Sequence, residues 1–156
     1  MGEFKKVCLL VLIGLFLGIS IVYVLSAYPI VYPDHELEQA KYDLEMAKRS
    51  YEVKDYKWAT IQAYYSIYHS GQAMTREKMS IDMKSNSHSV LSDDLTKAAK
   101  EGKISLKAVA NFNLARWNRV SANYRGDYTK SSAENNIEYA EMFFEEAKRI
   151  RDEAVN

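Results

Sequence analysis

The stretch of the chain between Lys6 and Asp34 contains no charged residue, and its apolar part runs from Val7 to Tyr28. A helix rises about 1.5 Å per residue, so about 20 apolar residues match the roughly 30 Å hydrocarbon core of a bilayer. Burying a helix that is apolar on every face would need a far larger protein. The stretch therefore predicts one transmembrane helix, residues 7–28, in contact with membrane lipid.

A secretory signal peptide cleaved after residue 26 is the alternative interpretation of this stretch, because a basic start precedes it. The apolar core of a signal peptide is typically about 7–15 residues long, which favours an uncleaved anchor. Lys5 and Lys6 precede the apolar stretch, whereas the first basic residue after it is Lys41. This bias favours an N-terminus inside the cytoplasm and predicts a domain outside it.

The remainder of the chain predicts one further domain, so the expected division is an anchor and linker over residues 1–33 and a domain over residues 34–156. That domain holds 19 of the 21 basic and 20 of the 21 acidic residues, because only Lys5, Lys6 and Glu3 precede it. The near-zero net charge makes no electrostatic case for general nucleic-acid binding.

Apolar residues in this domain recur at steps of three and four, which is the pattern of amphipathic helices, and no strand pattern occurs. Gly102 and Gly126 are expected to end helices, and Ser131 with Glu134 to form a capping box. The predicted fold is all-α: an antiparallel up-and-down four-helix bundle with an extra short helix, preceded by the transmembrane helix. The second helix has the broadest apolar face and is expected at the centre. The predicted helices span residues 34–53, 56–79, 90–101, 105–125 and 131–154.

Three short motifs lie in this domain in a fixed order: the pair Tyr64-Tyr65, the segment Ser87-His88-Ser89, and the segment from Arg119 to Tyr124 that reads RVSANY. This set resembles the HEPN domain, and in particular its small single-domain members. The resemblance covers nearly all of the domain. It implies a homodimer, a polar cleft that binds nucleotides or RNA ends in some members, and in many members a separate nucleotidyltransferase partner.

Other members of that family are ribonucleases that use an arginine followed four to six residues later by a histidine. Arg119 matches the arginine, but Tyr124 stands five residues later and no histidine follows. Acid–base chemistry near neutral pH needs a group that titrates near 7, whereas tyrosine titrates near 10 and Asn123 does not titrate. We therefore expect a non-catalytic binding or dimerisation module. A ribonuclease with a diverged site and a structural helical ectodomain are the alternatives.

The candidate ligand residues are Arg119, Asn123, Tyr124, Arg116 and His88. A guanidinium can bind phosphate through two parallel hydrogen bonds. Each residue also has a structural interpretation: Arg119 can pair with an acid inside the bundle, Arg116 can extend to solvent, and His88 can be a turn residue beside the helix cap Ser89.

The sequence predicts no metal and no cofactor. No two of its three histidines stand at ligand spacing, and its single cysteine, Cys8, lies in the apolar stretch. A glycine-rich phosphate loop is also missing from the sequence.

Overall fold

The computed structural model describes residues 33–79 and 87–155 of the chain. These residues form five α-helices and one short π-helix and contain no strand, which confirms the all-α prediction for the described part. The elements are α2 (Pro33–Glu52), α3 (Tyr56–Met79), α4 (His88–Lys100), α5 (Leu106–Val120), η1 (Ser121–Arg125) and α6 (Lys130–Val155).

The predicted anchor over residues 7–28, with the alternative cleavage after residue 26, lies outside the described residues. None of the helices in the described ranges combines the length and the apolar character that a bilayer crossing requires.

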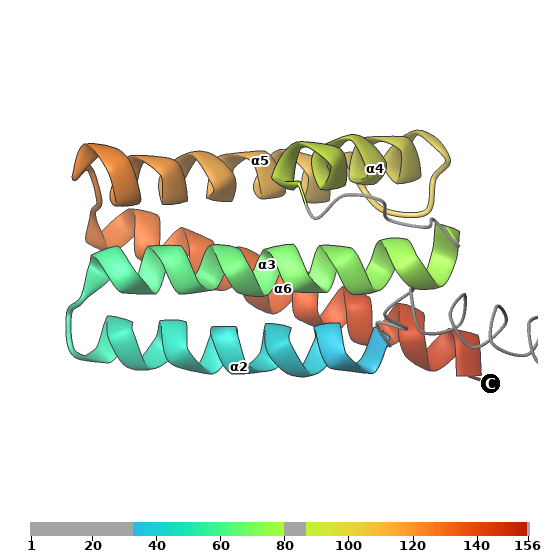
Figure 1. Cartoon of the computed structure of the whole chain (residues 1–156), viewed down its shortest axis with the longest axis horizontal. Helices are drawn as coiled ribbons and strands as arrows, with labels where there is room; N and C mark the ends of the chain where they lie inside the picture. Colours follow the sequence, from blue (N-terminus) through green and yellow to red (C-terminus); the bar gives the residue numbers. More distant parts are fainter. Residues whose placement is uncertain (1–32, 80–86, 156) are drawn as a thin grey trace, which may run out of the picture. The chain divides into compact units, whose positions relative to one another are not determined.

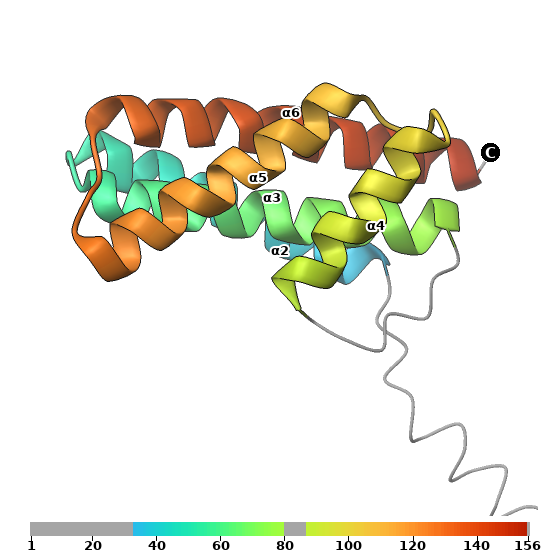
Figure 2. The ribbon, with the colours of Figure 1, turned by 90° about the horizontal axis from the view of Figure 1, so that it is seen from above.

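The four long helices α2, α3, α5 and α6 run in alternating directions along the domain (Figure 1). Helix α3 contacts α2, α4, α5, η1 and α6, as expected for the central helix. Seen from above, α5 crosses obliquely over α3, and α4 lies over the C-terminal half of α3 (Figure 2). The short helix α4 therefore covers the part of α3 that α5 leaves open.

Local sequence explains where most helices begin and end. Asp55 accepts a hydrogen bond from the amide of Trp58 through Oδ1 at 3.1 Å, which caps the start of α3. Gly102 and Gly126 have φ values of 72° and 67°, a conformation that glycine adopts without steric cost, so both predicted helix ends are confirmed.

Two predicted helix starts were wrong by one or two residues. Helix α4 begins at His88, because Ser87 rather than Ser89 is its N-cap and accepts from the Ser89 amide. Helix α6 is capped by Thr129 and Ser132, which exchange side-chain to amide hydrogen bonds of 2.9 and 3.0 Å, and not by Ser131 with Glu134.

The core follows α3 and the helix faces turned toward it. Tyr64 and Phe112 are fully buried, and the Phe112 and Phe143 rings pack 6.4 Å apart between α5 and α6. Gly71 lets α4 approach α3 closely, since a Cβ atom there would lie 3.3 Å from a Leu91 methyl carbon. The remaining fully buried large apolar residues are Ile67, Leu91, Leu95 and Ile150.

Candidate functional site

The motif from Arg119 to Tyr124 lies at the point where α5 changes into the π-helix η1. The amide of Gly126 bonds to the carbonyl of Ser121, five residues back, which adds one residue to the turn. In an α-helix Asn123, four residues on, would lie beside Arg119. The added residue brings Tyr124 there instead, and single π-turns of this kind are frequent at functional sites.

Arg119 is surrounded by tyrosine rings from two helices. Its Nη2 donates a 2.7 Å hydrogen bond to the Tyr65 hydroxyl. Its guanidinium carbon lies 5.9 Å from the Tyr64 ring centre, 5.5 Å from that of Tyr65 and 5.7 Å from that of Tyr124. These distances are within the range of attractive cation–π contacts.

The structure does not support the expectation that Arg119 pairs with an acid. Within the described part of the chain its polar partner is the Tyr65 hydroxyl, and its buried Nε has no hydrogen-bond partner in the protein. Burial acts to lower the pKa of Arg119, but the Tyr65 hydrogen bond and the adjacent tyrosines outweigh burial and raise it. Arg119 therefore holds a full positive charge with hydrogen-bonding capacity left over.

His88 joins this group of rings from the start of α4. Its Nδ1 lies 2.7 Å from the Tyr64 hydroxyl, and its ring centre lies 4.6 Å from that of Tyr68 and 6.4 Å from that of Tyr65. Burial lowers the pKa of His88, and the charges of Arg119 and Arg116 lower it further. Burial also raises the pKa of Tyr64. The tyrosine hydroxyl therefore donates, and neutral His88 accepts through Nδ1.

We call Arg119, Tyr64, Tyr65, Tyr124 and His88 the arginine–tyrosine cluster. The structure thus brings three of the predicted site residues together: Arg119, Tyr124 and His88. Arg116 is half-buried and reaches this group only through its charge, which acts on His88 and Tyr64. Asn123 is exposed and makes no side-chain hydrogen bond among the described residues, because the π-turn displaces it from Arg119.

The sequence interpretation missed that tyrosines of α3 belong to the site. Tyr64 and Tyr68 are buried and pack in the core. Tyr65 is half-buried and directs its hydroxyl at Arg119, 54 positions away in the chain. The adjacent tyrosines at 64 and 65 were the available signal, since neighbouring helix positions point in different directions.

The exposed side of η1 carries a second cation–π contact. The guanidinium carbon of Arg125 lies 4.5 Å from the ring centre of Trp117, and Trp117 is 54% exposed. Tyr124 is 71% exposed, so one face of its ring is open to a ligand.

The groups gathered here are chemically suited to an anion and to an aromatic ring. It offers one unsatisfied guanidinium, several tyrosine hydroxyls and rings, and one neutral imidazole. Among the described residues no three histidine, cysteine, aspartate or glutamate side chains converge to hold a metal ion. A separate hollow of about 560 Å³ is lined by α6, by the start of α5 with the residues before it, and by Met74 of α3. Its mainly apolar lining, which includes Ile104 and Phe143, does not reach Arg119.

Comparison with known proteins gives a family and a structural neighbour. The family model of the HEPN domain matches residues 34–150. The fold is similar to the crystal structure of TT1696 from Thermus thermophilus, with a TM-score of 0.64 and 18% sequence identity. That match covers 76% of this chain and 97% of the other.

No curated protein matches the chain significantly. The structural match shows a shared fold, and the family match covers most of the chain, including all three motifs. The chain belongs to the HEPN domain family.

Proposed function

We propose that this protein is a non-catalytic binding module whose arginine–tyrosine cluster holds a phosphate-bearing ligand, either a nucleotide or an RNA end. The observation that carries the proposal is Arg119: a charged guanidinium with a buried, unpartnered Nε and no carboxylate bound to it in the described part of the chain. Phosphate is the common biological anion whose geometry suits a guanidinium fork.

The rings around Arg119 favour a nucleotide over a simple anion. Tyr124 lies over the guanidinium and is 71% exposed, so its outer face is available to a base. Stacking of a base on an aromatic side chain contributes about 1–3 kcal/mol and tolerates any base. A ligand with both a phosphate and a base would thus use both features of the cluster.

Calorimetric titration of the full-length chain in mild detergent tests this proposal. The probes are inorganic phosphate, adenosine monophosphate and a short single-stranded RNA with a 5′ phosphate. We expect Arg119→Gln to weaken binding at least about tenfold, because a hydrogen bond to a charged group is worth about 1.5–3 kcal/mol. Arg49→Gln removes the same charge from an exposed site on α2 and should leave affinity unchanged.

The proposal is wrong if none of the three probes binds, or if Arg49→Gln reduces affinity as much as Arg119→Gln does. Binding of inorganic phosphate with the same affinity as the nucleotide would remove the role given to Tyr124.

A ribonuclease with a diverged site is the second candidate, and one observation favours it. His88 supplies, from α4, the imidazole that the motif after Arg119 lacks. Its lowered pKa keeps it neutral near pH 7, as a general base must be. To act as a base through Nε2, His88 would take the tautomer with its proton on Nδ1, which would then donate to the Tyr64 hydroxyl oxygen.

Decay of a labelled RNA in the presence of the full-length chain separates the two candidates. Turnover that both Arg119→Gln and His88→Gln abolish would contradict the non-catalytic proposal. Absence of turnover in the unaltered protein, together with retained RNA binding, would contradict the ribonuclease.

The proposal includes attachment to a membrane through residues 7–28, with the helical domain outside the cytoplasm. Its support is the length of the apolar stretch and the position of Lys5 and Lys6 before it. A reporter that is active only outside the cytoplasm, fused after Asn156, should therefore be active. Activity of a cytoplasmic reporter instead would overturn this placement and favour the ribonuclease, because RNA is abundant there.

We expect the domain to act as a homodimer, with a nucleotidyltransferase as a further partner, as the family resemblance implies. Exposed apolar side chains along α5 are consistent with a dimer face: Leu106 is 71%, Leu114 44% and Trp117 54% exposed. Light scattering of the detergent-solubilised chain should give twice the monomer mass, and Leu114→Glu should reduce it.

A further inference from the structure

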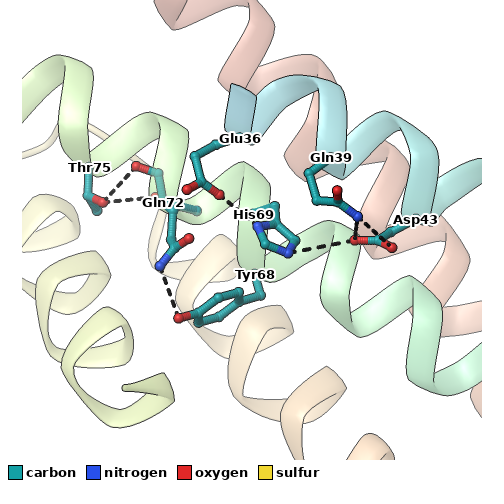
Figure 3. A network of polar contacts seen from close by, with 8 residues as sticks. Glu36, Gln39, Asp43, Tyr68, His69, Gln72 and Thr75 are labelled. Carbon is teal, nitrogen blue, oxygen red and sulfur yellow. Dashed lines mark hydrogen bonds and ion pairs between the residues drawn. The ribbon is translucent and has the colours of Figure 1, made fainter. Parts of the chain in front are cut away.

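A second group of polar side chains lies on the seam between α2 and α3, and the proposed function does not use it. Glu36, Gln39 and Asp43 project from successive turns of α2 toward His69 of α3 (Figure 3). Glu36 is 5% exposed and His69 is half-buried. Charged groups with so little contact with water need defined partners.

The two nitrogens of His69 face two different carboxylates. Nδ1 lies 2.7 Å from Glu36 Oε2, a normal hydrogen bond in which the imidazole donates its proton. Nε2 lies 3.7 Å from Asp43 Oδ2, which is too long for a hydrogen bond. In the tautomer that Glu36 selects, the proton is on Nδ1 and Nε2 carries a lone pair. Nε2 and Asp43 Oδ2 are then both hydrogen-bond acceptors, and they face each other across this gap.

A positive charge between these two acceptors, from a proton or from a metal ion, would remove their repulsion. The gap of 3.7 Å fits a metal ion. Zinc binds imidazole nitrogen and carboxylate oxygen at about 2.0–2.2 Å, which separates two ligand atoms by about 3.4 Å at the tetrahedral angle and somewhat more at wider angles. The hydrogen bond from Nδ1 to Glu36 is the outer-shell contact that orients most metal-binding histidines.

Gln39 can supply a third donor atom. Its amide nitrogen lies 3.3 Å from both Asp43 oxygens, and a half-turn about the terminal bond exchanges nitrogen and oxygen there.

We propose that His69 Nε2, Asp43 Oδ2 and the amide oxygen of Gln39 bind one divalent transition-metal ion of the zinc type, with Glu36 holding His69 in place. Water would complete the coordination, because no third histidine, cysteine or acidic ligand joins the group within the described ranges. The mixed nitrogen and oxygen donors suit Zn²⁺, Co²⁺ and Ni²⁺ rather than Ca²⁺ or Mg²⁺. The bound ion would join the N-terminal half of α2 to α3.

The other occupant of the gap is a proton on Nε2, which would make His69 an imidazolium paired with Asp43. A proton there would leave no vacancy for a metal ion, so a chain that holds it would not take up Zn²⁺ or Co²⁺ at this site. Titration with either metal ion therefore separates the two.

The experiment uses the full-length chain without a histidine tag, in detergent, after removal of metals by chelation. Titration with Zn²⁺ is followed by calorimetry, and titration with Co²⁺ by its visible absorption, at neutral and at mildly acidic pH. We expect one ion per chain with a micromolar dissociation constant that weakens in acid. We also expect a Co²⁺ spectrum typical of bound nitrogen.

Substitutions locate the site. His69→Gln and Asp43→Asn should abolish binding, and Glu36→Gln should weaken it at least about tenfold, as loss of an outer-shell partner does. Glu45→Gln removes an exposed carboxylate from α2 and His35→Gln removes an exposed histidine, and neither should change binding. Circular dichroism of the metal-free variants checks that they fold.

Absence of Zn²⁺ binding and of a Co²⁺ spectrum in the unaltered chain overturns the proposal without any variant. Binding that survives both His69→Gln and Asp43→Asn, or that His35→Gln removes, overturns it as well. Loss of Arg119-dependent ligand binding would not affect this result, because the two groups share no residue.

Discussion

The buried polar side chains of this bundle depend on defined partners, and Asn136 on α6 shows this best. It is fully buried. Its amide nitrogen donates to the Thr60 carbonyl at 3.1 Å and to the Ala115 carbonyl at 3.4 Å, and its oxygen accepts from Asn118 at 2.9 Å. One amide therefore joins α6 to both α3 and α5.

Replacing Asn136 by alanine should destabilise the domain by about 1–3 kcal/mol, because the Asn118 amide is left without its acceptor and a cavity opens. Thermal unfolding followed by circular dichroism measures the loss. Asn135→Ala is the matched control, since Asn135 is exposed on the adjacent position of the same helix. Equal losses in the two variants would contradict the role given to Asn136.

His88 should make the domain sensitive to acid. Its pKa is lowered in the folded chain, by burial first and by the charges of Arg119 and Arg116 next, so the unfolded chain takes up the proton more readily. Stability is therefore full above the unfolded pKa of about 6.5 and falls as the pH drops through the lower folded value.

Unfolding temperatures of the full-length chain and of His88→Gln, measured from about pH 8 to about pH 5, test this linkage. The glutamine oxygen can still accept from Tyr64 but does not titrate. We expect the loss in acid to be smaller in His88→Gln than in the unaltered chain. Parallel curves for the two proteins would show that another group is responsible.

At the scale of elements, helix ends are set by short-range hydrogen bonds that sequence patterns locate to within one or two residues. Both ends of α3 were predicted correctly, because the cap residue Asp55 and the extent of the apolar face indicate the same bounds. Several residues near the start of α6 can cap a helix, namely Thr129, Ser131 and Ser132. Only the path of the chain after Gly126 selects Thr129 with Ser132.

Removal of the observed cap and of the predicted cap should have different effects. Thr129→Ala loses the oxygen that accepts from the Ser132 amide and should cost about 1 kcal/mol, which lowers the unfolding temperature by a few degrees. Ser131→Ala changes an exposed residue outside the observed cap and should have almost no effect. A larger loss in Ser131→Ala would favour the predicted capping box instead.

The π-turn is an element that helical periodicity alone does not reveal. The apolar pattern over residues 105–125 predicts one continuous helix, and the described structure follows it as far as Val120. Because of the extra residue in η1, Tyr124 rather than Asn123 lies beside Arg119. Its effect on the site is therefore larger than its length of five residues suggests.

At the scale of the whole domain, stability depends on contacts that connect helices distant in sequence. Phe143 of α6 is 2% exposed, packs against Phe112 of α5, and belongs to the core around α3. The adjacent Phe144 is only partly buried at the edge of this core.

Phe143→Ala should cost about 3–5 kcal/mol, a large part of the stability of a domain this size. Phe144→Ala should cost clearly less, because its side chain keeps part of its contact with water when folded. Unfolding temperatures of the two variants make the comparison. The position of the core would need revision if Phe144→Ala were the more damaging change.

Local patterns in the amino-acid sequence were enough to predict the helices of the described residues. They also supplied the order of motifs that led to the HEPN family. These features depend on interactions within a few residues: apolar spacing, caps and glycines at positive φ. Which side chains meet across the bundle could be learned only from the packed domain.

Packing of different helices brings Tyr65 to Arg119 and His88 into the arginine–tyrosine cluster. Packing also places His69 between Glu36 and Asp43. The hydrogen-bonded pairs Tyr64–His88, Glu36–His69 and Tyr65–Arg119 are each 24 or more positions apart in the chain. Periodicity shows which face of a helix is buried. It does not show the rotation and shift of one helix against the next, because these follow from the fit of all core side chains at once.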